Sequence, residues 1–180
     1  MKRILYLHSG HHGPGTGTHG FIDEGTETIR LCDEIEHYLT CKYVRSNAKE
    51  KLTNDLIKRI NKQFGDKALI CDIHFNAFDG SAEGCEVFVS AKASSLSHCV
   101  ADDMLYKVHA IMQNSCRGVK PDNHSQYNKL AILSDTESPA ILVEPCFVDN
   151  KKDTEKYVRN FTTLAMGIAD VLNRYCNEEK

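Results

Sequence analysis

Three short apolar runs dominate the hydrophobic pattern of this chain, at residues 3–7, 68–71 and 139–143. Each is rich in branched side chains and is almost unbroken by polar residues. Runs of this kind are typical of strands that are buried on both faces of a largely parallel sheet. The pattern therefore predicts three inner strands.

The segments between these runs predict helices and further strands. Apolar residues recur at helical spacing in four segments, at residues 24–39, 52–64, 96–112 and 152–175. Thr53 or Asn54 is expected to begin the second helix, and Gly65 to end it. Further strands are predicted at residues 41–45, 85–89 and 130–133, and the last run is expected to continue to residue 147. Strands that alternate with helices predict a three-layer, phosphorylase/hydrolase-like α/β fold, in which helices flank a mostly parallel or mixed central sheet of about six strands.

Composition restricts the class of protein. The 180 residues, 41% of them hydrophobic, can build one core, so we predict a single domain over residues 1–176 and a polar tail at residues 177–180. The net charge of -3 provides no basic stripe for nucleic acid, and no apolar run approaches the roughly 18 residues that span a bilayer. Nucleic-acid and membrane partners are therefore not expected, and the sequence leaves the oligomeric state open.

The N-terminus and the cysteines indicate the compartment. No signal-type apolar core or small-residue cleavage site is present near the start, which predicts a protein that is made and kept in the cytosol. The eight cysteines are spread along the chain without a Cys-x-x-Cys pair. We expect them to be small buried apolar residues rather than disulfides or zinc ligands.

Histidine and acid residues follow the three inner runs. His11, His74 and Glu144 lie at or just past the ends of these runs. Ligands of an open sheet bind beyond the carboxyl ends of its strands, so these three segments are expected to converge on one pocket. Hydrolytic zinc sites often take two histidines and a carboxylate and leave one position for water. The sequence therefore predicts an open metal site.

The loop after the first strand offers several histidines. His11 stands beside a glycine, where the backbone can approach a ligand closely, and this favours a ligand role. His12 is the alternative ligand. His8 and His19 are expected to be polar loop residues.

Polar residues surround His74, just after the second run. An imidazole at the mouth of a buried strand is unfavourable unless it is paired or bound to a metal. Asp72 shares its face of the strand, and it either orients a ligand or is a polar residue at a sheet edge. Asn76 and the polar loop at residues 121–126 either contact substrate or are solvated.

Two further roles require carboxylates. Glu144 ends the most apolar strand, where a carboxylate is unfavourable without a cation or a catalytic task, so it is the candidate general acid and base. The third metal ligand is expected among Asp23, Glu24 and Glu27 at the start of the first helix. Helix capping explains a carboxylate there equally well, so the spacing leaves these alternatives open.

Four motifs follow one another along nearly the whole chain. They are Gly-His-His-Gly at 10–13, Gly-Phe-Ile-Asp-Glu at 20–24, Asp-Ile-His-Phe-Asn at 72–76 followed by Gly-Cys-Glu-Val at 84–87, and Pro-Ala-Ile-Leu-Val-Glu-Pro-Cys-Phe-Val-Asp-Asn at 139–150. Together they resemble the zinc-dependent N-acetylmuramoyl-L-alanine amidases of the type 3 family, which occur in bacterial autolysins, sporulation amidases and phage endolysins. That family usually has glycine in place of His12 and of Cys146.

The resemblance implies residue roles. His11, Glu24 and His74 would bind one zinc ion, and Glu144 would be the catalytic acid and base. Asn76 and His12 are the residues predicted to contact substrate.

The resemblance also implies the substrate, which is peptidoglycan. The bond cleaved would be the amide between the lactyl group of N-acetylmuramic acid and the L-alanine of the stem peptide. A phage endolysin or a lysis-released autolysin, held in the cytosol until lysis and then acting on the cell wall, is the expected biology. The alternatives are another zinc peptidase, such as a carboxypeptidase, and a non-catalytic cell-wall-binding domain.

Overall fold

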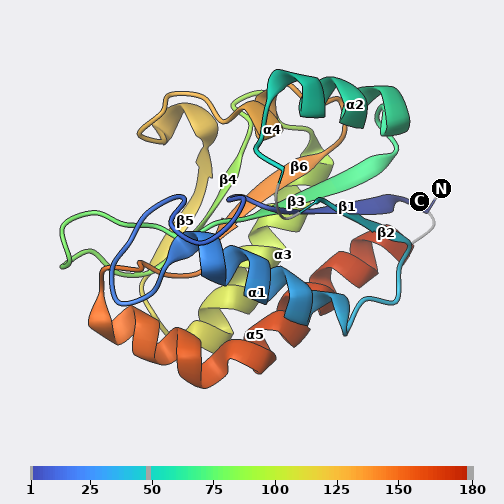
Figure 1. Cartoon of the computed structure of the whole chain (residues 1–180). Coiled ribbons are helices and arrows are strands. Elements are labelled where there is room, and N and C mark those ends of the chain that lie inside the picture. The colour runs from blue at the N-terminus through green and yellow to red at the C-terminus, as the bar shows by residue number, and fades with distance from the viewer. Residues whose placement is uncertain (1, 48–49, 178–180) are drawn as a thin grey trace.

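A six-stranded sheet forms the middle layer of the structure (Figure 1). The computed structural model describes residues 2–47 and 50–177, so most of the predicted polar tail lies outside the described residues. The strands are β1 (Ile4–Ser9), β2 (Tyr43–Arg45), β3 (Ala68–Ile73), β4 (Cys85–Val89), β5 (Cys116–Pro121) and β6 (Ala140–Glu144). Their order is β2-β1-β3-β6-β4-β5, and every neighbouring pair is parallel except β4 with β6. The predicted mixed, mostly parallel sheet is confirmed.

Helices cover both faces of this sheet (Figure 1). One face carries α1 (Glu24–Glu36), α3 (Ser95–Met112) and α5 (Lys151–Asn177), and the other carries α2 (Asn54–Phe64) and the short α4 (Ala131–Ser134). Successive strand residues point to opposite faces, so Leu69 and Cys71 enter the core under α1, α3 and α5, whereas Ile70 packs with α2. Burial on both faces explains the continuous apolar runs.

Most predicted elements are present, with small differences at their ends. Thr53 caps the start of α2 by accepting a hydrogen bond from the backbone N–H of Leu56, and Gly65 ends the helix with a φ of 54°. The first helix ends at Glu36 rather than at residue 39. No helix in the described part of the chain is long and apolar enough to cross a membrane.

Two predictions in the C-terminal half are wrong. The strand predicted at residues 130–133 is the short helix α4, which packs Ile132 and Leu133 into the core beneath α2. A four-residue apolar run carries too little periodicity to separate the two structures. Strand β5 was not predicted, because it is a half-exposed edge strand that contains Arg117, Gly118 and Lys120.

The cysteines agree with expectation except at two positions. All eight are free, and six are buried. Cys99 and Cys116 are exposed, because the first lies on the outer side of α3 and the second on the edge strand β5.

Candidate active site

The ends of β1, β3 and β6 bring the predicted site residues together. These strands are parallel neighbours, and Ile73 of β3 pairs in register with Val143 of β6. The backbone N–H of His74 donates to the carbonyl of Val143 over 2.9 Å. His74 and Glu144 therefore leave the sheet side by side, and His11 follows β1 at the same edge.

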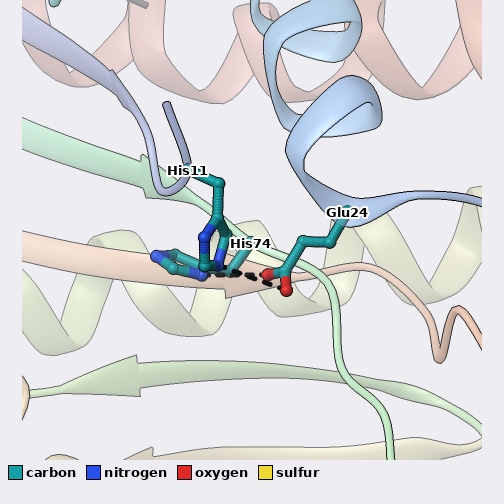
Figure 2. A group of neighbouring side chains, drawn as sticks. All are labelled: His11, Glu24 and His74. Carbon is teal, nitrogen blue, oxygen red and sulfur yellow. Dashed lines mark hydrogen bonds and ion pairs between the residues drawn. The ribbon is translucent and has the colours of Figure 1, made fainter. Parts of the chain in front are cut away.

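His11, Glu24 and His74 form a compact group (Figure 2). One potential ligand atom from each lies within 4.8 Å of the others. The Nε2 atom of His11 is 3.2 Å from Oε2 of Glu24, and Nδ1 of His74 is 3.1 Å from Oε1. Two imidazoles and a carboxylate that converge in this way can hold a divalent metal ion, and this donor set suits zinc.

The carboxylate of Glu24 is held in place by backbone and side-chain donors. The N–H and the hydroxyl of Thr18 donate to Oε2 over 2.8 and 3.0 Å, and the N–H of Phe75 donates to Oε1 over 3.0 Å. Burial alone would raise the pKa of Glu24, but the hydrogen bonds and charges of His11 and His74 outweigh it and hold the pKa well below its ordinary value. Glu24 is therefore an ionised and oriented ligand candidate.

Two glycines leave room for this group. A Cβ atom on Gly17, whose φ is +80°, would lie 2.5 Å from Oε2 of Glu24 and 2.7 Å from Nε2 of His11. A Cβ atom on Gly10 would lie 1.9 Å from Nε2 of His74. The backbone thus approaches the three side chains more closely than any residue with a Cβ atom permits.

The other two carboxylates at the start of α1 have structural partners. Asp23 caps the helix, since its Oδ1 accepts a 2.7 Å hydrogen bond from the N–H of Thr26. Glu27 accepts a 2.9 Å hydrogen bond from the hydroxyl of Tyr157 on α5 and pairs with Arg30. Of the three alternatives, only Glu24 lies in one group with His11 and His74.

His8 and Asp72 form a buried pair behind the group. The expectation that His8 is a polar loop residue is wrong, because it lies within β1 and is 1% exposed. Its Nδ1 atom is 2.7 Å from Oδ1 of Asp72, and Oδ2 of Asp72 is 3.2 Å from Nε2 of His74. Asp72 lies in the interior of the sheet rather than at its edge, which favours the alternative that it orients His74. His19 is an exposed loop residue, as expected.

Glu144 belongs to a second polar cluster beside the histidines. The side-chain amide of Asn76 donates to Oε2 of Glu144 over 2.7 Å and to Oε1 of Glu86 over 2.5 Å. Burial and then the charge of Glu86 raise the pKa of Glu144 to about 8. Sequence reasoning placed Glu86 only within a matching motif; a glutamate on an otherwise apolar strand was the available signal.

A cavity of about 440 Å³ opens from this cluster across β4 and β5. His74, Asn76, Glu144 and Tyr127 are among the residues that line it. Within the described residues, His12 is half-buried and, like His11 and Glu24, is not part of this lining, so its contact with substrate stays a prediction. Arg117 and Lys120 also line the cavity, and neither was predicted as a site residue, because strand β5 was not predicted.

Comparison with known proteins assigns the family. Residues 5–174 match the type 3 amidase family, whose description is N-acetylmuramoyl-L-alanine amidase. This chain belongs to that family. The amidase is 30% identical to the endolysin of Bacillus phage SPP1 over 193 residues, which cover 96% of this chain and 67% of the endolysin.

Other relatives agree with this assignment. An uncharacterized cell wall amidase of Bacillus anthracis is 31% identical to the amidase over 164 residues, and the match spans 77% of this chain and only 30% of that protein. The crystal structure of N-acetylmuramoyl-L-alanine amidase from Clostridium difficile 630 has the same fold, with a TM-score of 0.82, 20% identity and 99% coverage of both chains. The predicted enzyme class, a peptidoglycan-hydrolysing amidase, and the predicted fold are both confirmed.

Proposed function

We propose that residues 1–176 form a zinc amidase catalytic domain that cleaves the amide between the lactyl group of N-acetylmuramic acid and the L-alanine of the stem peptide. The observation that carries this proposal is the convergence of His11, Glu24 and His74 into one group, in which His74 lines the same cavity as Glu144. Membership of the family supports the bond that is cleaved. Relatives named endolysin and cell wall amidase support peptidoglycan as the polymer.

We assign one zinc ion to His11, Glu24 and His74. The site fits this ion because it offers two imidazole nitrogens and one ionised carboxylate, and because Gly17 leaves the space between them open. When bound, zinc supplies a Lewis acid that polarises the amide carbonyl and lowers the pKa of water to about 7.

Glu144 transfers the protons in this mechanism. Asn76 holds Oε2 of Glu144, and the carboxylate of Glu144 accepts the proton of the attacking water. The same carboxyl group then delivers a proton to the nitrogen of the departing L-alanine as the amide bond breaks. The raised pKa of Glu144 suits the step in which it donates a proton to the departing amine. No covalent enzyme intermediate is required.

Asn76 has a positioning role through Glu144 and Glu86, whereas direct substrate contacts by Asn76 and His12 stay predictions. The biological setting that we propose is a phage endolysin or lysis-released autolysin. It would be held in the cytosol until the membrane fails, and it would then act on the cell wall. The similarity to a phage endolysin supports this setting.

The test is digestion of purified peptidoglycan by zinc-loaded parent protein and by Glu144→Gln. We expect the parent to release new N-terminal alanine without new reducing sugar ends. Glu144→Gln should keep its zinc and lose turnover by at least about 100-fold, the scale of general acid–base catalysis. Glu155→Gln, on the exposed side of α5, is the matched control and should retain activity.

Other results would identify a different protein. Release of free amino acids from peptide ends would indicate a carboxypeptidase. Binding to peptidoglycan with no new amines from the parent would indicate a wall-binding domain. Full activity of metal-free protein in excess chelator would exclude the zinc mechanism.

A further inference from the structure

Two cations of the edge strand β5 lie in the cavity that leads away from Glu144. Arg117 and Lys120 both line this cavity, and both contact the carboxylate of Glu86 on the adjacent strand. The mechanism above uses neither cation. Their position, one strand beyond the strand that pairs with Glu144, indicates a role in binding the substrate.

Three side chains donate hydrogen bonds to the carboxylate of Glu86, and two of them are cations. Its Oε1 atom accepts from the amide of Asn76, and its Oε2 atom accepts from Nε of Arg117 over 3.0 Å and from the ammonium of Lys120. Glu86 is only 3% exposed, so it cannot turn towards the solvent. Glu86 can neutralise only one of the two cations that contact it, so the second cation is left without a carboxylate of its own.

Arg117 carries the positive charge that Glu86 leaves available for a ligand. Its Nε atom faces Glu86, and its guanidinium carbon lies 4.9 Å from the centre of the Phe147 ring. These two contacts fix the plane of the guanidinium group. Among the described residues, no hydrogen-bond acceptor is found for its two Nη atoms, and the side chain is 35% exposed. An oriented pair of N–H donors of this kind matches a carboxylate in the bidentate mode.

The spacing between Arg117 and the reacting bond fits a peptide. Glu86 pairs directly with Glu144, and β5 is the next strand, so the two strand spacings amount to about 10 Å. Two residues of extended peptide span about 7 Å, and the length of the arginine side chain covers the remainder. A carboxylate on the residue after the L-alanine would therefore reach the guanidinium group when the scissile amide lies at Glu144.

We propose that Arg117 binds a free carboxylate on the stem-peptide residue that follows L-alanine, with Lys120 balancing Glu86 so that the guanidinium remains available. This inference rests on the proposed amidase function, because it assigns the peptide side of the cleaved bond to this cavity. It makes Arg117 a specificity-determining residue that distinguishes a carboxylate from its amidated form.

The test compares two dipeptides that differ in one group, L-alanyl-D-isoglutamate and L-alanyl-D-isoglutamine, each with its γ-carboxyl group blocked as a methylamide so that only the first carries a free carboxylate. Their binding to the zinc-loaded protein is measured by NMR titration, which does not depend on turnover. We expect the parent to bind the carboxylate form about tenfold more tightly, as a charge-assisted hydrogen bond predicts. Arg117→Gln should reduce this preference to about one, and Arg117→Lys should retain part of it.

The control is Arg174→Gln, which removes an arginine that pairs with Asp103 at the surface, and it should keep the preference of the parent. Equal binding of both dipeptides by the parent, binding of neither, or an unchanged preference in Arg117→Gln would overturn the inference. Hydrolysis of peptidoglycan is measured separately. If Arg117→Gln loses the preference for the carboxylate dipeptide but the parent does not hydrolyse peptidoglycan, only the proposed function is contradicted. If the parent hydrolyses peptidoglycan but shows no preference between the dipeptides, only the inference about Arg117 is contradicted.

Discussion

The Nδ1 atom of His8 and the Oδ1 atom of Asp72 lie 2.7 Å apart in the interior of the sheet, on the neighbouring strands β1 and β3. Both side chains are almost completely buried, so neither exchanges this partner for water. The second oxygen of Asp72 faces His74. One buried carboxylate thus connects a histidine of β1 to a candidate metal ligand.

Substitution of Asp72 by asparagine is expected to weaken zinc binding. The amide is uncharged, so it would orient the imidazole of His74 less firmly. Outer-shell partners of this kind typically change metal affinity 10–100-fold. Competition with a chromophoric chelator measures the effect, and Asp66→Asn, at an exposed turn, is the control. Equal zinc affinity in both variants would show that Asp72 has only a structural role.

Substitution by glutamine is expected to lower zinc affinity at Glu24 and to lower stability at Glu27. Glu24→Gln removes the carboxylate between His11 and His74, so its zinc affinity should fall by more than the roughly 10–100-fold of an outer-shell change. Glu27→Gln should keep its zinc and lose about 1 kcal/mol of stability, because its partners are Tyr157 and Arg30. Chelator competition and urea unfolding measure the two effects. The opposite result would place the third ligand at Glu27.

Gly17→Ala and Gly15→Ala provide a matched test of the space around the site. Both glycines have a positive φ, +80° and +79°, so each substitution should cost about 1–2 kcal/mol of stability. A Cβ atom at residue 17 meets Glu24 and His11, whereas one at residue 15 meets nothing within 4 Å. Zinc affinity should therefore fall only in Gly17→Ala. A similar loss in both variants would attribute it to the backbone of the loop instead.

Asp122 is expected to make stability depend on acid pH. Burial would raise its pKa, but hydrogen bonds from the hydroxyl of Ser134 and the N–H groups of Ala91 and Leu130 outweigh burial and lower it. A lowered folded-state pKa stabilises the protein above the unfolded value of about 3.9, and this contribution is lost as the pH falls further.

Asp122→Asn should therefore be less stable than the parent by about 1–3 kcal/mol at pH 7, and the difference should narrow below about pH 4. Urea unfolding at pH 7 and pH 3 measures it. Asp102→Asn, at an exposed position of α3, controls for the loss of one negative charge. A difference that stays constant between the two pH values would contradict the assigned role.

The fold was largely predictable because its inner strands are buried on both faces. Residues 85–89 form a strand with the expected bounds, and the run at residues 68–71 lies within β3, since continuous or alternating apolar runs reflect that burial directly. Strand β5 was not predictable, because Arg117 and Lys120 face a polar cavity at the edge of the sheet. The run at residues 130–133 lies largely in the helix α4, which packs against β6 in the core cluster that it shares with α2, and local sequence does not encode such long-range contacts.

The sequence by itself determined that His11, His74 and Glu144 share one edge of the molecule, because parallel strands present their carboxyl ends together. It also determined the family, through motifs whose order and spacing are retained along the chain. Spacing left Glu24 open beside Asp23 and Glu27, and the family resemblance selected it; the tertiary structure supplied the reason, because Glu24 reaches His11 and His74. Only the tertiary structure paired His8 with Asp72. Carboxylates that cap a helix and carboxylates that bind a metal are the same residue type at the same place in a sequence. Their roles are decided by which side chains from distant segments pack against them.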